Sequence, residues 1–132
     1  METTPERAWN TLFAGMQWEQ WDPATVQLLD IKGGLVDGGT FRFQLNTPLK
    51  FASARLSNVT PNERFKFSGK AAYGLLSFYG LIELRPNGLD KTIIEYTFGL
   101  GGLVGTTLAV ISYDKTLGDV QRGLDNMAAI VT

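Results

Sequence analysis

The sequence predicts an α+β fold in which one antiparallel sheet packs against a long C-terminal helix. Three observations indicate it: helical spacing of apolar residues near the N-terminus, a two-residue alternation from about residue 24 to residue 100, and helical spacing again to the end. The chain has 132 residues, which is enough for a core without disulfides or metals. We therefore expect residues 1–132 to form a single domain.

The N-terminal segment carries the signals of a helix start. Thr4 can cap the helix, Pro5 suits its first position, and Glu6 places negative charge in its first turn. Apolar residues then recur at spacings of three and four, namely Trp9, Leu12, Phe13 and Met16. A second short helical piece, residues 17–22, ends at Pro23, which cannot continue a helix.

Six strands are expected, over residues 26–31, 41–45, 51–59, 64–68, 76–85 and 91–100. Asp37-Gly-Gly39 is interpreted as a tight hairpin turn, and Pro86-Asn-Gly88 as another turn. Short connections predict an antiparallel meander with one apolar face and one polar face. The third strand is ambiguous, because Phe51 disagrees in parity with Ala52 and its apolar successors.

The C-terminal segment returns to helical spacing after a glycine-rich link over residues 99–105. Its apolar stripe consists of Val110, Tyr113, Leu117, Val120, Leu124, Met127 and Val131. A stripe this regular indicates one long amphipathic helix lying on the sheet. The link precedes a helix but lacks the lysine and hydroxyl residue of a phosphate-binding loop, so a simple strand-to-helix turn is the favoured interpretation.

Composition excludes several classes of function. The chain has no cysteine and no histidine, which removes thiolate catalysis, Ser/His/Asp catalysis and the commonest metal ligands. No metal or cofactor is therefore expected. The net charge is −1 and no basic domain stands out, so nucleic acid is not an expected partner. Without a transmembrane segment or a signal-peptide pattern, a cytoplasmic location is expected.

Local patterns resemble the START and polyketide-cyclase-like superfamily, also called SRPBCC. Thr4-Pro-Glu-Arg-Ala-Trp9 is similar to its opening helix, and Trp21-Asp-Pro23 to its tryptophan–proline step. Val36-Asp-Gly-Gly-Thr-Phe41 is similar to its glycine turn, and Val59-Thr-Pro-Asn-Glu-Arg-Phe65 to a later link. The resemblance implies a helix-grip fold, with the curved sheet wrapped on the C-terminal helix.

The superfamily resemblance also implies a cavity between the concave sheet face and that helix, holding a small hydrophobic ligand such as a lipid or polyketide. On this sequence the lining would be Phe41, Phe43, Phe67, Phe78, Ile82, Ile94, Tyr96, Phe98, Tyr113 and Leu117. Tyr96 and Tyr113 would orient the ligand, because a buried phenol needs a hydrogen-bond partner. The plainer interpretation is that these aromatic residues only fill the core.

Two other functions remain open at this stage. A cyclase or dehydratase could use the same cavity with Tyr96 or Tyr113 as the acid. The carboxylates Asp30, Glu83 and Glu95 are weaker candidates, since Glu83 and Glu95 have outward parity and suit cross-strand pairing with residues such as Arg85. A protein-interaction module with a filled core is the second alternative.

The chain departs from the superfamily at its start, because residues 1–3 are too few for the family's first strand. Either the true start of the protein lies further upstream or the domain lacks that strand. In the second case the strand over residues 91–100 must keep an open edge or pair with residues 26–31. Open edges are usually covered, so a homodimer through this edge is expected. A basic stripe of Arg64, Lys66 and Lys70, joined by Lys50 or Arg55, indicates a solvated outer face, with an anionic partner as the alternative.

Overall fold

The computed structural model of the protein describes residues 3–46, 50–71, 76–101 and 120–130. Its helices and strands are α1 (Pro5–Leu12), the short 3-10 helix η1 (Trp18–Gln20), β1 (Thr25–Lys32), β2 (Thr40–Leu45), β3 (Phe51–Thr60), β4 (Arg64–Ala71), β5 (Leu76–Pro86) and β6 (Thr92–Gly101). A C-terminal helix over residues 120–130 follows. The predicted order of elements is confirmed for these residues.

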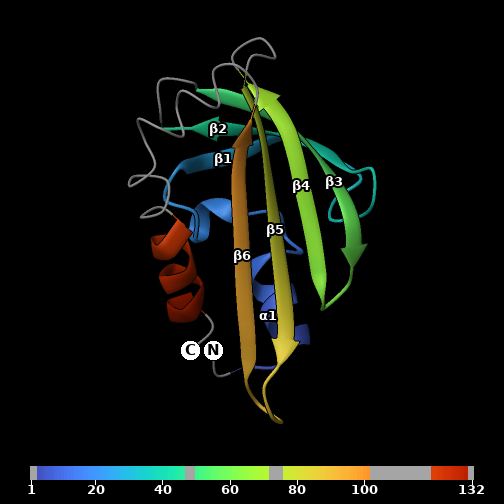
Figure 1. Ribbon diagram of the computed structural model, residues 1–132, viewed down its shortest axis with the longest axis vertical. Helices are drawn as coiled ribbons and strands as arrows, with labels where there is room; N and C mark the ends of the chain where they lie inside the picture. Colours follow the sequence, from blue (N-terminus) through green and yellow to red (C-terminus); the bar gives the residue numbers. More distant parts are fainter. Residues whose placement is uncertain (1–2, 47–49, 72–75, 102–119, 131–132) are drawn as a thin grey trace.

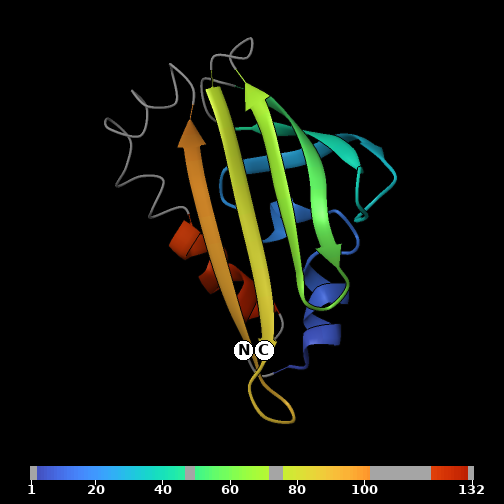
Figure 2. The same cartoon turned by 45° about the vertical axis from the view of Figure 1, so that its right-hand side comes forward.

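The strands form one antiparallel sheet in the order β1-β2-β3-β4-β5-β6, each paired with the next along the chain. The sheet is strongly curved, so that β1 and β2 run across behind the long strands β4 to β6 (Figure 1). The C-terminal helix lies alongside β6 in this view and in the rotated view of Figure 2. This confirms an α+β fold with a curved six-stranded sheet, a short N-terminal helix and a C-terminal helix.

The helix α1 begins as predicted. The Thr4 hydroxyl accepts a hydrogen bond from the backbone N–H of Arg7 at 3.3 Å, and Pro5 occupies the first turn. The helix ends at Leu12, earlier than its apolar stripe suggests. Phe13 and Met16 are still buried, because the chain turns at Met16, which has φ 55°, and follows the concave face.

The predicted tight hairpin at Asp37-Gly-Gly39 is wrong. The connection between β1 and β2 spans residues 33–39, too long for a tight hairpin. The Gly39 N–H closes a turn on the Val36 carbonyl at 3.0 Å, but Gly38 and Gly39 also bond to β3. The Gly38 N–H donates to the Leu56 carbonyl at 2.9 Å, and the Leu56 N–H donates to the Gly39 carbonyl at 2.8 Å. The predicted turn residues therefore form a turn within a longer connection, which is held by pairing with a strand further along the chain.

The structure also decides where the glycine-rich link begins and which side chains of β3 face inward. Gly99 belongs to β6 and not to the glycine-rich link, and the ring of Tyr79 on β5 lies over it. In β3 the side chains of Ala52, Ala54 and Leu56 are buried while Phe51 is 45% exposed, so the two alanines set the parity of the strand. The ring of Phe51 instead lies beneath the Arg42 guanidinium on the outer face.

Within the described residues, β1 and β6 are the two edges of the sheet, and β6 pairs with β5 alone. The alternative pairing of β6 with residues 26–31 is therefore not formed. The start of β6 contacts the N-terminal segment through a hydrogen bond from the Thr92 hydroxyl to the Thr3 carbonyl at 2.6 Å. The expected homodimer through the β6 edge stays a prediction.

The C-terminal helix is described over residues 120–130, about half of the predicted length. Within this part the predicted stripe faces the sheet, because Met127 is fully buried and Leu124 packs against the core. Tyr113 and Leu117 lie outside the described residues. Among the helices of the described part, none combines the length and apolar character needed to cross a bilayer.

Candidate functional site

The concave face of the sheet is filled at its centre by Trp18 from η1, whose side chain is fully buried. Its ring lies 5.0 Å from Phe41, 5.9 Å from Phe43 and 5.5 Å from Phe67, measured between centroids. The indole N–H points to the Phe13 carbonyl at 3.5 Å. Three of the residues predicted to line a cavity thus pack directly on a tryptophan that the sequence reasoning did not place there.

Two further predicted lining residues, Phe78 and Ile82, belong to β5 and extend this core. Phe78 contacts Phe43 and Phe67 at centroid distances of 6.0 and 6.4 Å, and 9% of its surface remains exposed. Ile82 is fully buried. The structure therefore brings these five predicted residues together around one aromatic cluster with Trp18.

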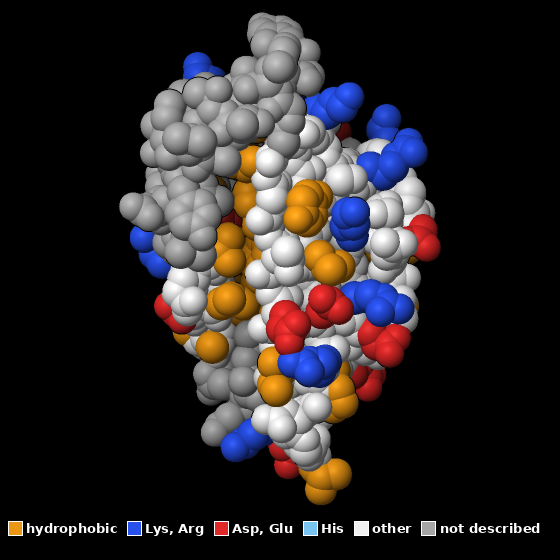
Figure 3. Space-filling model, in the orientation of Figure 1, with side chains coloured by type: hydrophobic (Ala, Val, Ile, Leu, Met, Phe, Trp, Pro, Cys, Tyr) orange, Lys and Arg blue, Asp and Glu red, His pale blue; other side chains and the backbone are white. Residues whose placement is uncertain are grey.

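The remaining predicted residues from the sheet lie on β6, and they are less deeply buried than those around Trp18. Ile94, Tyr96 and Phe98 share the inward parity of the strand with Leu100, and all four are only partly buried. Figure 3 shows hydrophobic side chains gathered in a row along the side of the sheet nearest the C-terminal helix. Within the described residues, this apolar row of β6 is the most accessible part of the predicted lining.

The C-terminal helix is anchored beside this apolar row through Trp21. The Asn126 side-chain amide donates to the Trp21 carbonyl at 3.0 Å, and Gly123 of the helix lies beside the indole ring. The Trp21 ring in turn lies 6.2 Å from Tyr96, which lies 6.5 Å from Phe98. Strand β6 and the C-terminal helix therefore meet around Trp21.

Tyr96 is the polar group of this region. Burial raises the pKa of the Tyr96 phenol well above its usual range, and the carboxylate of Asp22 raises it further. Asp22 is fixed at the start of β1, where it accepts hydrogen bonds from the Ala24 N–H at 3.1 Å and the Thr25 hydroxyl at 2.7 Å. No hydrogen bond joins the Tyr96 hydroxyl to any other residue in the described part of the chain. The neutral phenol can thus donate a hydrogen bond to a bound molecule.

The carboxylates considered for acid–base chemistry lie away from the apolar row. Asp30 pairs with Arg42 at 2.7 Å, and Glu95 pairs with Arg85, as its outward parity predicts. Glu83 lies on the outer face, opposite Arg64 in the pairing of β4 and β5. Each of these groups is part of the outer surface or its ion pairs.

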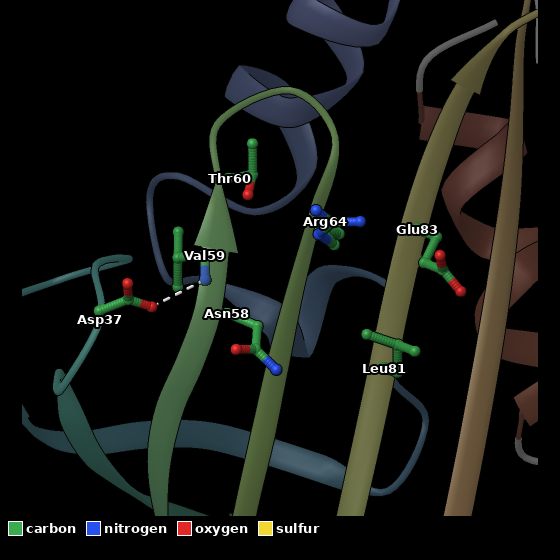
Figure 4. A pocket seen from close by; sticks show the side chains of 7 residues that line it. All are labelled: Asp37, Asn58, Val59, Thr60, Arg64, Leu81 and Glu83. Atoms are coloured by element: carbon green, nitrogen blue, oxygen red, sulfur yellow. Dashed lines mark hydrogen bonds between the residues drawn. The ribbon is translucent and has the colours of Figure 1, made fainter.

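The outer face also has a polar groove of about 480 Å³ that the sequence did not indicate. It is lined by Asp37, Asn58, Val59, Thr60, Arg64, Leu81 and Glu83 (Figure 4). The Asp37 carboxylate accepts a hydrogen bond from the Val59 N–H at 2.8 Å, which holds the β1–β2 connection at its rim. The only local sign in the sequence is Asn58, a residue type that tolerates the left-handed conformation it adopts here.

Comparison with known proteins shows similarity of fold. No protein-family model matches the chain, and no curated protein matches it in sequence. Among solved structures, a conserved protein from Geobacillus kaustophilus aligns over 98% of this chain and 91% of its own, with 17% identity and a TM-score of 0.59. An uncharacterized protein from Rhizobium leguminosarum aligns over 98% and 88%, with 17% identity and a TM-score of 0.61.

A third similar structure is CalU16 from Micromonospora echinospora, which aligns over 99% of this chain and 81% of its own. Its sequence identity is 17% and its TM-score 0.58. At this level of identity the three structures show a shared fold and nothing about activity. They do show that the arrangement of sheet and helices seen here occurs in proteins of three different bacteria.

Proposed function

We propose that this protein is a helix-grip domain of the START and polyketide-cyclase-like superfamily that binds a small hydrophobic ligand. The ligand would lie between β6 and the C-terminal helix, on the apolar row of Ile94, Tyr96, Phe98 and Leu100. The element order and the four local sequence patterns support the family, and the fold shared with bacterial proteins is compatible with it.

One observation carries the choice of site: the apolar row is incompletely buried although it lies on the concave face. Phe41, Phe67 and Ile82 on the same face are at most 3% exposed, whereas the inward residues of β6 are partly exposed. Apolar clefts with a few polar groups are the usual sites for small ligands. Tyr96 supplies such a polar group, and its neutral hydroxyl suits a carbonyl or ether oxygen.

A filled core is the basis of the second candidate, a protein-interaction module. Trp18 occupies the centre of the concave face, and five aromatic rings surround it. If the remaining space near β6 is closed as well, the domain has no room for a ligand. The choice between the two functions therefore depends on the β6 side alone. A cyclase or dehydratase has no such observation in its favour.

Binding of a neutral apolar dye tests the proposal. We expect Nile red to bind the wild-type protein with saturable fluorescence, and Phe98→Asn to weaken this binding about tenfold, because a polar side chain interrupts the apolar row. Ile93→Asn is the matched control on the same strand, since Ile93 is 39% exposed on the other face. Equal binding by both variants, at equal stability to denaturant, would contradict the proposed site.

A further inference from the structure

The outer face of the sheet carries a group of cations that form no ion pair with another residue in the described part of the chain. Arg55 on β3 and Lys70 on β4 are exposed, and Lys66 is partly exposed. Strand register brings the three together: Ser53 pairs with Lys70, Arg55 with Ser68, and Ser57 with Lys66, so Arg55 is diagonal to both lysines. We call Arg55, Lys66, Lys70 and Tyr79 the cationic patch.

Among the described residues, the carboxylate that strand register places next to the cationic patch is Glu83, which is diagonal to Lys66 and directly opposite Arg64. Residues 51–57, 66–70 and 77–81 include no aspartate or glutamate, and the outward residues between the cations are serines. The two ion pairs of the described residues, Arg42–Asp30 and Arg85–Glu95, do not involve the patch. In Figure 3 acidic side chains gather lower on this face, away from the basic side chains at its top. The chain thus concentrates positive charge here despite a net charge of −1.

An exposed aromatic ring completes the cationic patch. Tyr79 is 42% exposed and pairs with Ser68 on the neighbouring strand β4. The Lys66 ammonium lies over the Tyr79 ring, 5.4 Å from the ring centroid. Gly99 leaves the space in which this ring lies flat on β6. Tyrosine beside lysine and arginine is typical of protein surfaces at the interface of a bilayer, where the ring meets headgroups and the cations meet phosphates.

We propose that the cationic patch docks this protein onto an anionic lipid membrane. A bilayer surface requires only positive charge and interfacial aromatic rings, which this side of the sheet supplies. A single nucleic-acid strand requires open rings for successive bases. The exposed rings here, Phe51 and Tyr79, lie on β3 and β5 with β4 between them, and each is covered by a cation. The inference does not depend on the proposed ligand, because the cationic patch is on the opposite face from the apolar row.

Co-sedimentation with vesicles tests the inference. We expect the wild-type protein to bind phosphatidylcholine vesicles containing phosphatidylserine, and to release them at high salt, because charges at a surface are screened. The variant Arg55→Gln/Lys66→Gln/Lys70→Gln should lose binding roughly 100-fold, at about fivefold or 1 kcal/mol per cation. The control Arg7→Gln/Lys32→Gln/Lys91→Gln changes the net charge equally at exposed positions outside the cationic patch, and should bind within about threefold of the wild type.

Three results would overturn the inference. The first is equal binding of the wild type to vesicles with and without phosphatidylserine. The second is an equal loss in both triple variants, which would show a response to net charge alone. The third is salt-sensitive binding to a single-stranded oligonucleotide, lost in the patch variant, without binding to vesicles. Nile red binding should be unchanged in the patch variant, so a failure here is distinct from a failure of the proposed ligand site.

Discussion

The ring of Phe67 on β4 lies over Gly80 on β5, in the space that a side chain at Gly80 would need. The two residues are direct partners in the strand register, and both face the buried concave side. Tyr79 and Gly99 repeat the arrangement on the outer face, one strand further along. Glycine thus lets an aromatic ring lie flat against the neighbouring strand, which tightens the sheet on both faces.

The substitution Gly80→Ala should destabilise the fold, because the added methyl group would collide with the Phe67 ring. We expect a loss of about 2–3 kcal/mol in the free energy of unfolding, the cost of overfilling a packed core. Denaturant unfolding measures it. Gly15→Ala is the control: no atom lies within 4 Å of its added carbon, so a change within about 0.5 kcal/mol is expected. Equal effects of the two substitutions would contradict the described packing.

Trp18 should be one of the largest single contributors to stability. Its indole is fully buried among five other aromatic rings, so Trp18→Ala leaves a large cavity and should cost about 3–5 kcal/mol of unfolding free energy. Leu89→Ala provides the comparison, since Leu89 is 93% exposed. A Trp18→Ala protein that unfolds at the same denaturant concentration as Leu89→Ala would show that Trp18 does not fill the concave face.

Tyr96 predicts a pH dependence of stability at alkaline pH. The pKa of its phenol is raised in the folded protein by burial and by Asp22, relative to about 10 in the unfolded chain. Below pH 10 the phenol keeps its proton in both the folded and the unfolded state, so its contribution to the free energy of unfolding does not change with pH. Above pH 10 the unfolded state releases the proton first, so the free energy of unfolding falls by up to about 1.4 kcal/mol per pH unit.

The variant Tyr96→Phe should remove this part of the alkaline dependence. Denaturant unfolding at a series of pH values from neutral to alkaline gives the two profiles. We expect that of the variant to fall less steeply than that of the wild type above pH 10. Parallel profiles would show that the phenol ionises as readily in the folded protein as in the unfolded chain.

Asn126 should hold the C-terminal helix to the N-terminal part of the chain. Asn126→Ala removes the hydrogen bond to the Trp21 carbonyl, and we expect a loss of about 1 kcal/mol in the local stability of the helix. Amide hydrogen exchange over residues 120–130 should accelerate correspondingly. Gln121→Ala is the matched control, because the Gln121 side chain bonds to Asp125 within the same helix and to no other residue in the described part of the chain. Unchanged exchange in Asn126→Ala would contradict the anchoring role.

Much of the fold could be predicted from local patterns. The Thr4 cap, the inward parity of Leu76, Phe78, Ile82 and Leu84, and the Arg85–Glu95 pair follow directly from spacing and charge. The length of the β1–β2 connection could not, because Gly38 and Gly39 also form hydrogen bonds with Leu56, far along the chain.

The site was less predictable than the fold. Parity identifies the inward residues of a strand but not what lies above them, and Trp18 sits in a short 3-10 helix with no periodicity to indicate its direction. The outer groove depends on four separate elements, namely the β1–β2 connection, β3 with Asn58 in the left-handed conformation, β4 and β5, so no single stretch of sequence contains it.

The central claim is that the space beside β6 holds a small apolar molecule. Native mass spectrometry of the protein purified from its source, without detergent or organic solvent, tests it most directly. The account predicts a population carrying one small organic molecule, present in the wild type and in Ile93→Asn and reduced in Phe98→Asn. A protein that is found only in the bare form, and stays bare after incubation with an organic extract of its own cells, would contradict it.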